Sequence, residues 1–390
     1  MPNVRIAARP AQRIGHPLHG ANPLCVLCLE GDLPECLPQE LGPVLASGGR
    51  ATKPFAEDSV MRLFSAFSRF ALSIAAYVAF ACVRPEWCNA QVARIELHPI
   101  QTMTLSDEQV LTGAHDGKPA TIAGELRIPR VGTDRLPAVV LVHGSGGIGA
   151  NYDRWSAELN GLGIATFIID GFTGRGIAST VEDQEQLGRL TMIYDLYRAL
   201  AVLAAHPRID PARIAILGGS RGGQIALYAS LKRFQRAYGR PGVEFAAYLP
   251  LYAPCNTTYI EDTDVSDRPI RLFHGDADDY DPVAPCRAYV ERLRAAGKDV
   301  QLTEYPDTHH LFDNALFSTT PVLWPRAQTT RRCVLKEEPM GRIINAETGQ
   351  PFTYADPCVE RGVHIAYNPA AHAATVRAVK EFLRATFKLN

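Results

Sequence analysis

Short, uninterrupted apolar runs alternate with helical patterns from about residue 120 onward, and this alternation limits the fold more than any other feature of the sequence. Apolar runs without polar alternation suit parallel strands that are buried on both faces. They occupy residues 138–142, 164–169, 214–217, 245–250 and 270–273, after an alternating segment at 121–129. Segments with helical spacing occupy 152–162, 182–206, 221–232, 283–296 and 370–387. This order predicts an α/β domain with a mostly parallel central sheet flanked by helices on both faces.

The charge balance argues against a nucleic-acid-binding protein. The chain has 390 residues, with 40 Lys and Arg against 41 Asp and Glu, so its net charge is −1. Binding of nucleic acid generally requires a basic surplus or a basic stripe. The hydrophobic content of 46% is ordinary for a globular enzyme. We therefore expect a single domain over residues 91–390 that binds no nucleic acid.

Residues 1–90 have the pattern of a leader rather than of a folded domain. Residues 1–60 contain scattered Pro and Gly without a sustained period, which favours a disordered extension or a start site assigned too far upstream. Met61 then opens a segment with two arginines and the uncharged run 70–83. This arrangement predicts a signal peptide over 61–90, export to the periplasm or the medium, and no membrane span after cleavage. The alternative is a buried or membrane-anchoring helix, and a chain that does not use this signal would stay in the cytoplasm.

Four cysteines follow residue 90, and an even number in an exported chain suggests disulfides. Of the three possible pairings we favour Cys255–Cys286 and Cys333–Cys358; the alternative is four free thiols. The second pair falls within residues 313–367, where five prolines interrupt any periodicity. We expect that segment to be a long loop that acts as a lid or as a cover.

The segment Gly218–Gly222 reads Gly-Gly-Ser-Arg-Gly and joins an apolar run to a helical pattern. A turn that passes directly from strand to helix leaves almost no room for side chains beside the serine, which explains the glycines. The serine hydroxyl then projects at the carboxyl edge of the sheet, where the helix directs its N-terminal amides. This context predicts that Ser220 is a nucleophile.

A nucleophilic serine needs a base, and the base needs a carboxylate that orients it. The run 270–273 ends at a loop with four aspartates, of which Asp278 is our choice for the acid and Asp281 the next. A later loop offers His309 and His310 as candidate bases. Both loops follow strands, so their side chains should meet at the same edge of the sheet as Ser220.

An oxyanion hole needs backbone N–H donors near the nucleophile. We expect the amide of Arg221 to be one donor and the amide of Ser145 to be the other, since Ser145 lies in the glycine-rich loop after strand 138–142. Gly144 would let that loop approach the substrate. The loop matches neither a P-loop nor a dinucleotide fingerprint, so we expect no nucleotide cofactor. The N-terminal cysteines lack a fourth ligand at finger spacing, and we predict no metal.

Residues 206–223, 274–283 and 305–312 resemble the dienelactone hydrolase family within the α/β-hydrolases. The resemblance covers about 115–388 and implies the α/β-hydrolase fold. It implies Asp278 as the acid and His310 as the base, with His309 as a neighbour that could line the substrate pocket. It also extends to the loop at 170–176, where Arg175 would be structural or would line the pocket.

Two features depart from the founding members of that family. They use cysteine where this chain has Ser220, and they lack the His-Gly-Ser-Gly-Gly loop. The resemblance therefore implies a hydrolase without fixing its substrate. We expect cleavage of a small carboxylic ester through an acyl-enzyme. The alternatives are a serine peptidase of the prolyl-oligopeptidase type and a non-catalytic binding protein with this fold. The sequence predicts no oligomeric state.

Overall fold

The computed structural model describes residues 92–389. The predicted extension at 1–60 and the predicted signal peptide at 61–90 lie outside the described residues. Among residues 92–389, no helix is long and apolar enough to cross a membrane.

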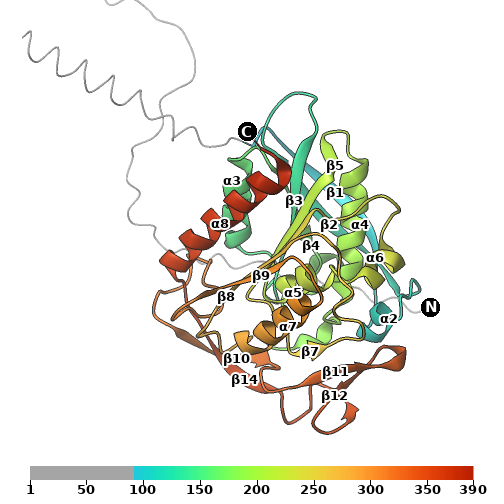
Figure 1. The fold of residues 1–390 in the computed structure, drawn as a ribbon, viewed down its shortest axis with the longest axis vertical. Coiled ribbons are helices and arrows are strands. Elements are labelled where there is room, and N and C mark those ends of the chain that lie inside the picture. The colour runs from blue at the N-terminus through green and yellow to red at the C-terminus, as the bar shows by residue number, and fades with distance from the viewer. Residues whose placement is uncertain (1–91, 390) are drawn as a thin grey trace, which may run out of the picture. The chain divides into compact units, whose positions relative to one another are not determined.

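The centre of the fold is an eight-stranded sheet with the order β1-β2-β4-β3-β5-β6-β8-β9 (Figure 1). β1 and β2 form an antiparallel pair, β2 also runs antiparallel to β4, and the other neighbours are parallel. The strands are β1 (Arg94–Thr104), β2 (Lys118–Ile128), β3 (Leu136–Val142), β4 (Ala165–Asp170), β5 (Ile209–Gly219), β6 (Ala247–Leu251), β8 (Ile270–Gly275) and β9 (Val300–Tyr305). The predicted mostly parallel sheet is confirmed.

The continuous apolar runs are the central strands because both faces of the sheet are covered. In β3, Val140 and Val142 belong to the core on one face, while Val139 and Leu141 belong to the core on the other. All seven residues of β3 are buried. A strand that packs on both sides has no position for a polar side chain.

The helices divide between the two faces. The first core contains apolar side chains from α4 (Thr191–Ala205), α5 (Arg221–Tyr228), α6 (Lys232–Tyr238) and α7 (Val283–Ala295), together with the short α2 (Asp107–Leu111). The second core contains side chains from α3 (Ala150–Asn160) and α8 (Pro369–Phe387). Two short 3₁₀ turns, Thr173–Arg175 (η2) and Gln184–Gln186 (η3), lie between β4 and α4.

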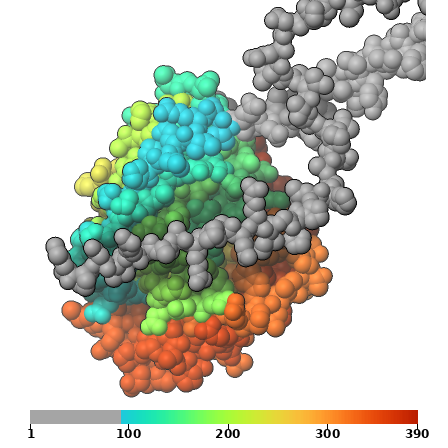
Figure 2. All heavy atoms as spheres, turned by 180° about the vertical axis from the view of Figure 1, so that it is seen from behind, coloured from blue at the N-terminus to red at the C-terminus, as the bar shows by residue number. Residues whose placement is uncertain are grey.

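The prediction of a long loop at 313–367 is wrong, because this segment contains short strands. β10 (Val322–Thr329) pairs antiparallel with β14 (Glu360–Ile365). β11 (Leu335–Glu338), β12 (Arg342–Asn345) and β13 (Gln350–Pro351) form a small sheet with β7 (Thr257–Thr258), and η4 (Pro339–Gly341) joins β11 to β12. We call residues 313–367 the cover. Its orange and red atoms gather at one end of the molecule in Figure 2.

Both disulfides favoured from the sequence are present. Cys255, after β6, is bonded to Cys286 on α7, with Cα atoms 5.0 Å apart. Cys333 is bonded to Cys358 inside the cover, also with Cα atoms 5.0 Å apart. The alternative of four free thiols is therefore wrong. Disulfides of this kind are typical of oxidising compartments outside the cytosol.

Candidate active site

Ser220 lies at the turn between β5 and α5. Its backbone has φ 57° and ψ −123°, a conformation that L-residues rarely adopt and that is often found at functional sites. The flanking glycines are required sterically. A Cβ on Gly218 would lie 2.3 Å from the carbonyl oxygen of Gly222, and one on Gly222 would lie 2.0 Å from that of Val142. The strand-to-helix turn predicted from the sequence thus holds Ser220 at the carboxyl edge of the sheet.

Asp278 and His310 come from the loops after β8 and β9, and they form a buried pair. The Nδ1–H of His310 donates to Oδ2 of Asp278 at 2.7 Å. The other carboxylate oxygen, Oδ1, accepts the backbone N–H groups of Tyr280 and Asp281, each at 2.9 Å. These contacts fix both the carboxylate and the orientation of the ring.

The charges of this pair stabilise each other. Burial alone disfavours both charged forms, but the attraction between Asp278 and His310 outweighs it. The pKa of Asp278 is therefore held well below its ordinary value, and the pKa of His310 is raised. His274 also lies 3.5 Å from Asp278, although its Nε2 contacts the backbone oxygen of Asp281 at 2.7 Å.

Ser220 and His310 line one cavity of about 190 Å³, which we call the catalytic cavity. The loop after β3 contributes Gly144 and Ser145 to its wall. The cover contributes Trp324 from β10, so this segment forms part of the wall of the cavity.

The two predicted oxyanion donors differ in their relation to the catalytic cavity. Ser145 lies in the catalytic cavity, and its backbone N–H donates to no acceptor among residues 92–389. Arg221 is the first residue of α5, and its side chain does not line the cavity. That side chain is fully buried and donates to the carbonyl oxygens of Leu187, Gly188 and Gln184.

Gln184 joins the separate parts of the site, and sequence analysis missed it. Its Oε1 accepts from Nη2 of Arg221 at 2.7 Å and from Oγ of Ser145 at 3.0 Å. Its Nε2 donates to the hydroxyl of Tyr280 at 3.2 Å, and the Tyr280 ring lies 4.7 Å from the His310 ring. The side chain is almost completely buried. The sequence predicts a helix over 182–206, whereas Gln184 lies in the 3₁₀ turn before α4. A single glutamine among polar neighbours carries no signal of this role.

A second group behind His310 was also missed. The Asp313 carboxylate accepts from Nε1 of Trp155 at 2.7 Å and from the hydroxyl of Tyr252 at 2.8 Å. The Tyr252 ring packs edge-on against His310, with ring centroids 4.7 Å apart. These residues are 158 and 61 positions from Asp313 in the sequence, so no local pattern relates them.

Arg175 and His309 do not line the catalytic cavity, which corrects the pocket role considered for each. Arg175 forms a buried ion pair with Asp195 at 2.7 Å, so of its two possible roles the structure favours the structural one. His309 lies beside His364, with ring centroids 6.3 Å apart. His310 lines the cavity whereas its neighbour His309 does not.

Comparison with known proteins now gives the family. The model of the dienelactone hydrolase family matches residues 122–387, more than half of the chain. The chain belongs to the dienelactone hydrolase family. The matched region contains β2 from Ile122 onward and all later strands of the central sheet, and it includes Ser220, Asp278 and His310.

Individual relatives of this family member are distant. A probable carboxylic ester hydrolase of Mycobacterium tuberculosis, LipM, is 29% identical over 163 residues, which cover 31% of this chain and 38% of that protein. The chain thus matches well under half the length of this curated relative.

Solved structures of similar fold include a dienelactone hydrolase-like promiscuous phosphotriesterase, P91, from metagenomic libraries. It shares 15% identity, covers 76% of this chain and 98% of its own, and has a TM-score of 0.47. Another is a putative dienelactone hydrolase from Klebsiella pneumoniae, with 17% identity, 56% and 89% coverage, and a TM-score of 0.43.

Proposed function

We propose that this member of the dienelactone hydrolase family is a serine hydrolase that cleaves small carboxylic esters. The observation that carries the proposal is the arrangement of three side chains. Ser220 and His310 line one cavity, and His310 is hydrogen-bonded to the buried carboxylate of Asp278. A nucleophile, a base and an orienting acid are the requirements for acyl transfer through a serine.

In this mechanism the Nε2 of His310 takes the proton of Ser220 as the Ser220 oxygen attacks the ester carbonyl. Asp278 keeps the Nδ1–H in place and stabilises the imidazolium that forms. The same proton then passes to the departing alcohol, and the acyl group stays on Ser220. Water, activated by His310, attacks the acyl-enzyme and releases the acid and the free serine.

The oxyanion that forms at each step carries a negative charge that needs fixed donors. The amides of Arg221 and Ser145 are our candidates, because Arg221 begins α5 and Ser145 lines the catalytic cavity. A helix N-terminus adds favourable partial charge at the same place. Losing one such donor generally costs about 10²- to 10³-fold in turnover.

The cavity volume bears on the size of the substrate, and the disulfides bear on the location of the protein. A cavity of about 190 Å³ suits a short acyl group or a small alcohol group. The two disulfides fit export from the cytosol, and we propose that the segment 61–90 is the signal that directs it.

The test is hydrolysis of p-nitrophenyl acetate and butyrate by the wild-type protein and by Ser220→Ala. We expect the variant to lose about 10⁴- to 10⁶-fold in kcat, in line with other triads. Ser318→Ala is a matched control, because Ser318 is exposed on the cover. Equal turnover by wild type and Ser220→Ala would exclude Ser220 as nucleophile. A folded wild-type protein that neither turns over these esters nor reacts with a fluorophosphonate would argue for a binding protein.

A further inference from the structure

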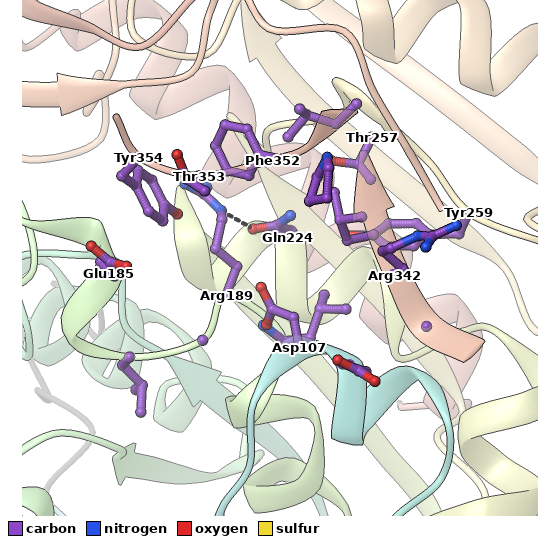
Figure 3. Close-up of a pocket in the computed structure, with 18 residues that line it drawn as sticks. Asp107, Glu185, Arg189, Gln224, Thr257, Tyr259, Arg342, Phe352, Thr353 and Tyr354 are labelled. Atoms are coloured by element: carbon purple, nitrogen blue, oxygen red, sulfur yellow. Dashed lines mark hydrogen bonds between the residues drawn. The ribbon is translucent and has the colours of Figure 1, made fainter. Parts of the chain in front are cut away.

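A second cavity, of about 350 Å³, lies outside the catalytic cavity. It is lined by residues of α2, of the segment that leads into α4, of α5 and of β7, and by the cover from β11 to beyond β13 (Figure 3). Neither Ser220 nor His310 lines it. We call it the arginine cavity, after Arg189.

Arg189 is a cation without a carboxylate partner. Its Nε donates to Oε1 of Gln224 at 3.0 Å. Among the described residues, no carboxylate oxygen lies within 4.0 Å of Arg189, and the acceptor that its guanidinium approaches besides Gln224 is the hydroxyl oxygen of Tyr354. Figure 3 shows the side chain reaching into the cavity toward Tyr354. A guanidinium group in this state offers its planar fork to a bidentate acceptor.

A second donor faces the same space. The hydroxyl of Tyr354 is buried and has no hydrogen-bond partner within residues 92–389. In Figure 3 this hydroxyl points toward the end of Arg189. Buried polar groups in proteins are nearly always hydrogen-bonded, so the Tyr354 O–H, which lies beside the Arg189 guanidinium and donates to no described residue, favours an acceptor from outside the chain.

The nearby acids form no ion pair with Arg189 among the described residues, although the buried carboxylate of Asp281 attracts it at longer range. The Oδ1 of Asp107 accepts the backbone N–H of Leu190 at 2.8 Å. Glu108 and Glu185 are exposed side chains of the lining. Arg342, also in the lining, is paired with Glu338 at 2.6 Å. The acids leave the guanidinium fork of Arg189 free and place negative charge toward solvent.

A further positive charge lies behind the wall. The buried guanidinium of Arg221 is bonded to backbone carbonyl oxygens and to the Gln184 amide, and no carboxylate lies within 4.0 Å of it among the described residues. Burial, with the nearby charge of Arg189, lowers the pKa of Arg221 to about 10, so both groups stay charged at neutral pH. Two neighbouring cations favour an anion in the cavity.

The other side chains that line the cavity include aromatic and aliphatic groups, which favour a ligand with a flat apolar body. Aromatic side chains line the cavity, namely Phe352 and Tyr354 of the cover and Tyr259, which follows β7. Leu187 and Ile343 add aliphatic surface. Aromatic walls favour a flat apolar group that stacks or packs edge-on. An anion with a flat apolar body therefore matches both the charge and the walls.

We propose that the arginine cavity binds a small planar organic carboxylate, whose two oxygens accept from Arg189 and Tyr354. This inference is independent of the proposed ester hydrolysis, since none of its residues touches the reacting atoms. The site is nevertheless close to the nucleophile, because the backbone N–H of Gln224 donates to the backbone oxygen of Ser220 at 2.9 Å.

The test uses isothermal titration calorimetry of the full chain with benzoate as the probe and benzamide as its neutral counterpart. We expect benzoate to bind and benzamide to bind at least about tenfold more weakly, because the charge-assisted pair is lost. Wild-type protein that binds no benzoate, or that binds both probes equally, would overturn the proposal.

Variants then locate the site. Arg189→Gln should weaken benzoate binding by about 10- to 100-fold, and Arg189→Lys by less, since charge remains without the fork. Arg384→Gln, an exposed change on α8, is the matched control and should bind as wild type does. Thr353→Trp, at an exposed position of the lining, should block the cavity even if Arg189→Gln fails to fold. Unchanged binding in Arg189→Gln or in Thr353→Trp would sink the proposal.

A further experiment distinguishes benzoate binding in the arginine cavity from binding in the catalytic cavity. Protein whose Ser220 carries a phosphonate should still bind benzoate, because the arginine cavity stays open. Loss of binding on labelling would mean that benzoate occupies the catalytic cavity, and the proposal would fall. A protein that resists labelling but loses benzoate binding in Arg189→Gln would contradict the proposed hydrolysis and support the arginine cavity.

Discussion

Asp278 and Asp281 lie in one loop, and the carboxylate of Asp278 is the one that contacts the His310 ring. We expect Asp278→Asn to lower kcat by about 10⁴-fold, because the amide cannot hold the histidine in its required tautomer. Asp281→Asn is the matched control. Its side chain makes no hydrogen bond to His310 in the described structure, so it should keep most of the activity. The measurement is kcat for both variants. If Asp281→Asn were inactive and Asp278→Asn active, Asp281 and not Asp278 would be the acid of the triad.

The pH dependence of kcat/KM follows from the same pair. His310 acts as a base only when it is neutral, so activity should rise as the pH passes upward through its pKa. Asp278 raises that pKa above the ordinary histidine value even though burial opposes the shift. The acidic limb should therefore lie above about pH 6.5 in the wild type. It should move to lower pH in Asp278→Asn, because the stabilising charge is gone. If the acidic limb of the kcat/KM profile were at the same pH in Asp278→Asn as in the wild type, a group other than His310 would control it.

Gln184 is a positioning residue in our interpretation, since it touches Ser145 and Arg221 but not the reacting atoms. Gln184→Leu keeps the volume and removes the acceptor. We expect kcat to fall by about 10- to 100-fold with KM nearly unchanged, because a displaced oxyanion donor acts on the transition state. Gln184→Glu keeps the acceptor and should retain more activity. A purely structural role would lower the melting temperature of both variants without separating kcat from KM, so both quantities are measured.

At the level of elements, local pattern predicts the sheet and fails for the cover. β3 and residues 214–217 of β5 are continuous apolar runs, and a strand buried on both faces shows this in its own sequence. β10 pairs with β14 about 30 residues away, and its register shifts between Trp324 and Gln328, around Pro325. Such short strands are specified by pairing with distant segments, which a single sequence does not display. The same holds for Gln184 and Asp313, whereas Ser220, Asp278 and His310 follow strand ends and could be predicted.

The disulfide inside the cover, Cys333–Cys358, should affect both the stability of the protein and substrate binding. The Cys333–Cys358 bond closes a segment with a sequence separation of 25, and the chain-entropy model assigns about 3–4 kcal/mol to a loop of this size. The variant Cys333→Ser with Cys358→Ser should therefore unfold at a lower denaturant concentration. Because Trp324 of the cover lines the catalytic cavity, KM should also rise. A variant with unchanged stability and KM would show that the cover folds without this disulfide. Equilibrium unfolding in urea and ester hydrolysis provide the two readouts.

At the level of the whole molecule, the stabilisation expected from the two disulfides is large compared with the free energy of unfolding of a typical domain. Each closes a loop of similar length, with sequence separations of 31 and 25, so together they contribute about 7 kcal/mol in the chain-entropy model. Native proteins are generally stable by only about 5–15 kcal/mol. The folded state of residues 91–390 should therefore depend on an oxidising environment.

We expect the reduced protein to unfold at a much lower urea concentration than the oxidised protein, and the native protein to resist reduction. Cys255 and Cys286 are both buried, so a reductant reaches that bond only when the structure opens, whereas Cys358 is partly exposed and its bond to Cys333 should be reduced first. The measurement is a pair of urea titrations, with and without dithiothreitol after reduction in denaturant, together with counts of reactive thiols. Oxidised and reduced protein with the same midpoint would remove the dependence on oxidation. That result would also remove the main physical support for export, because a chain that is equally stable with free thiols gains nothing from an oxidising compartment.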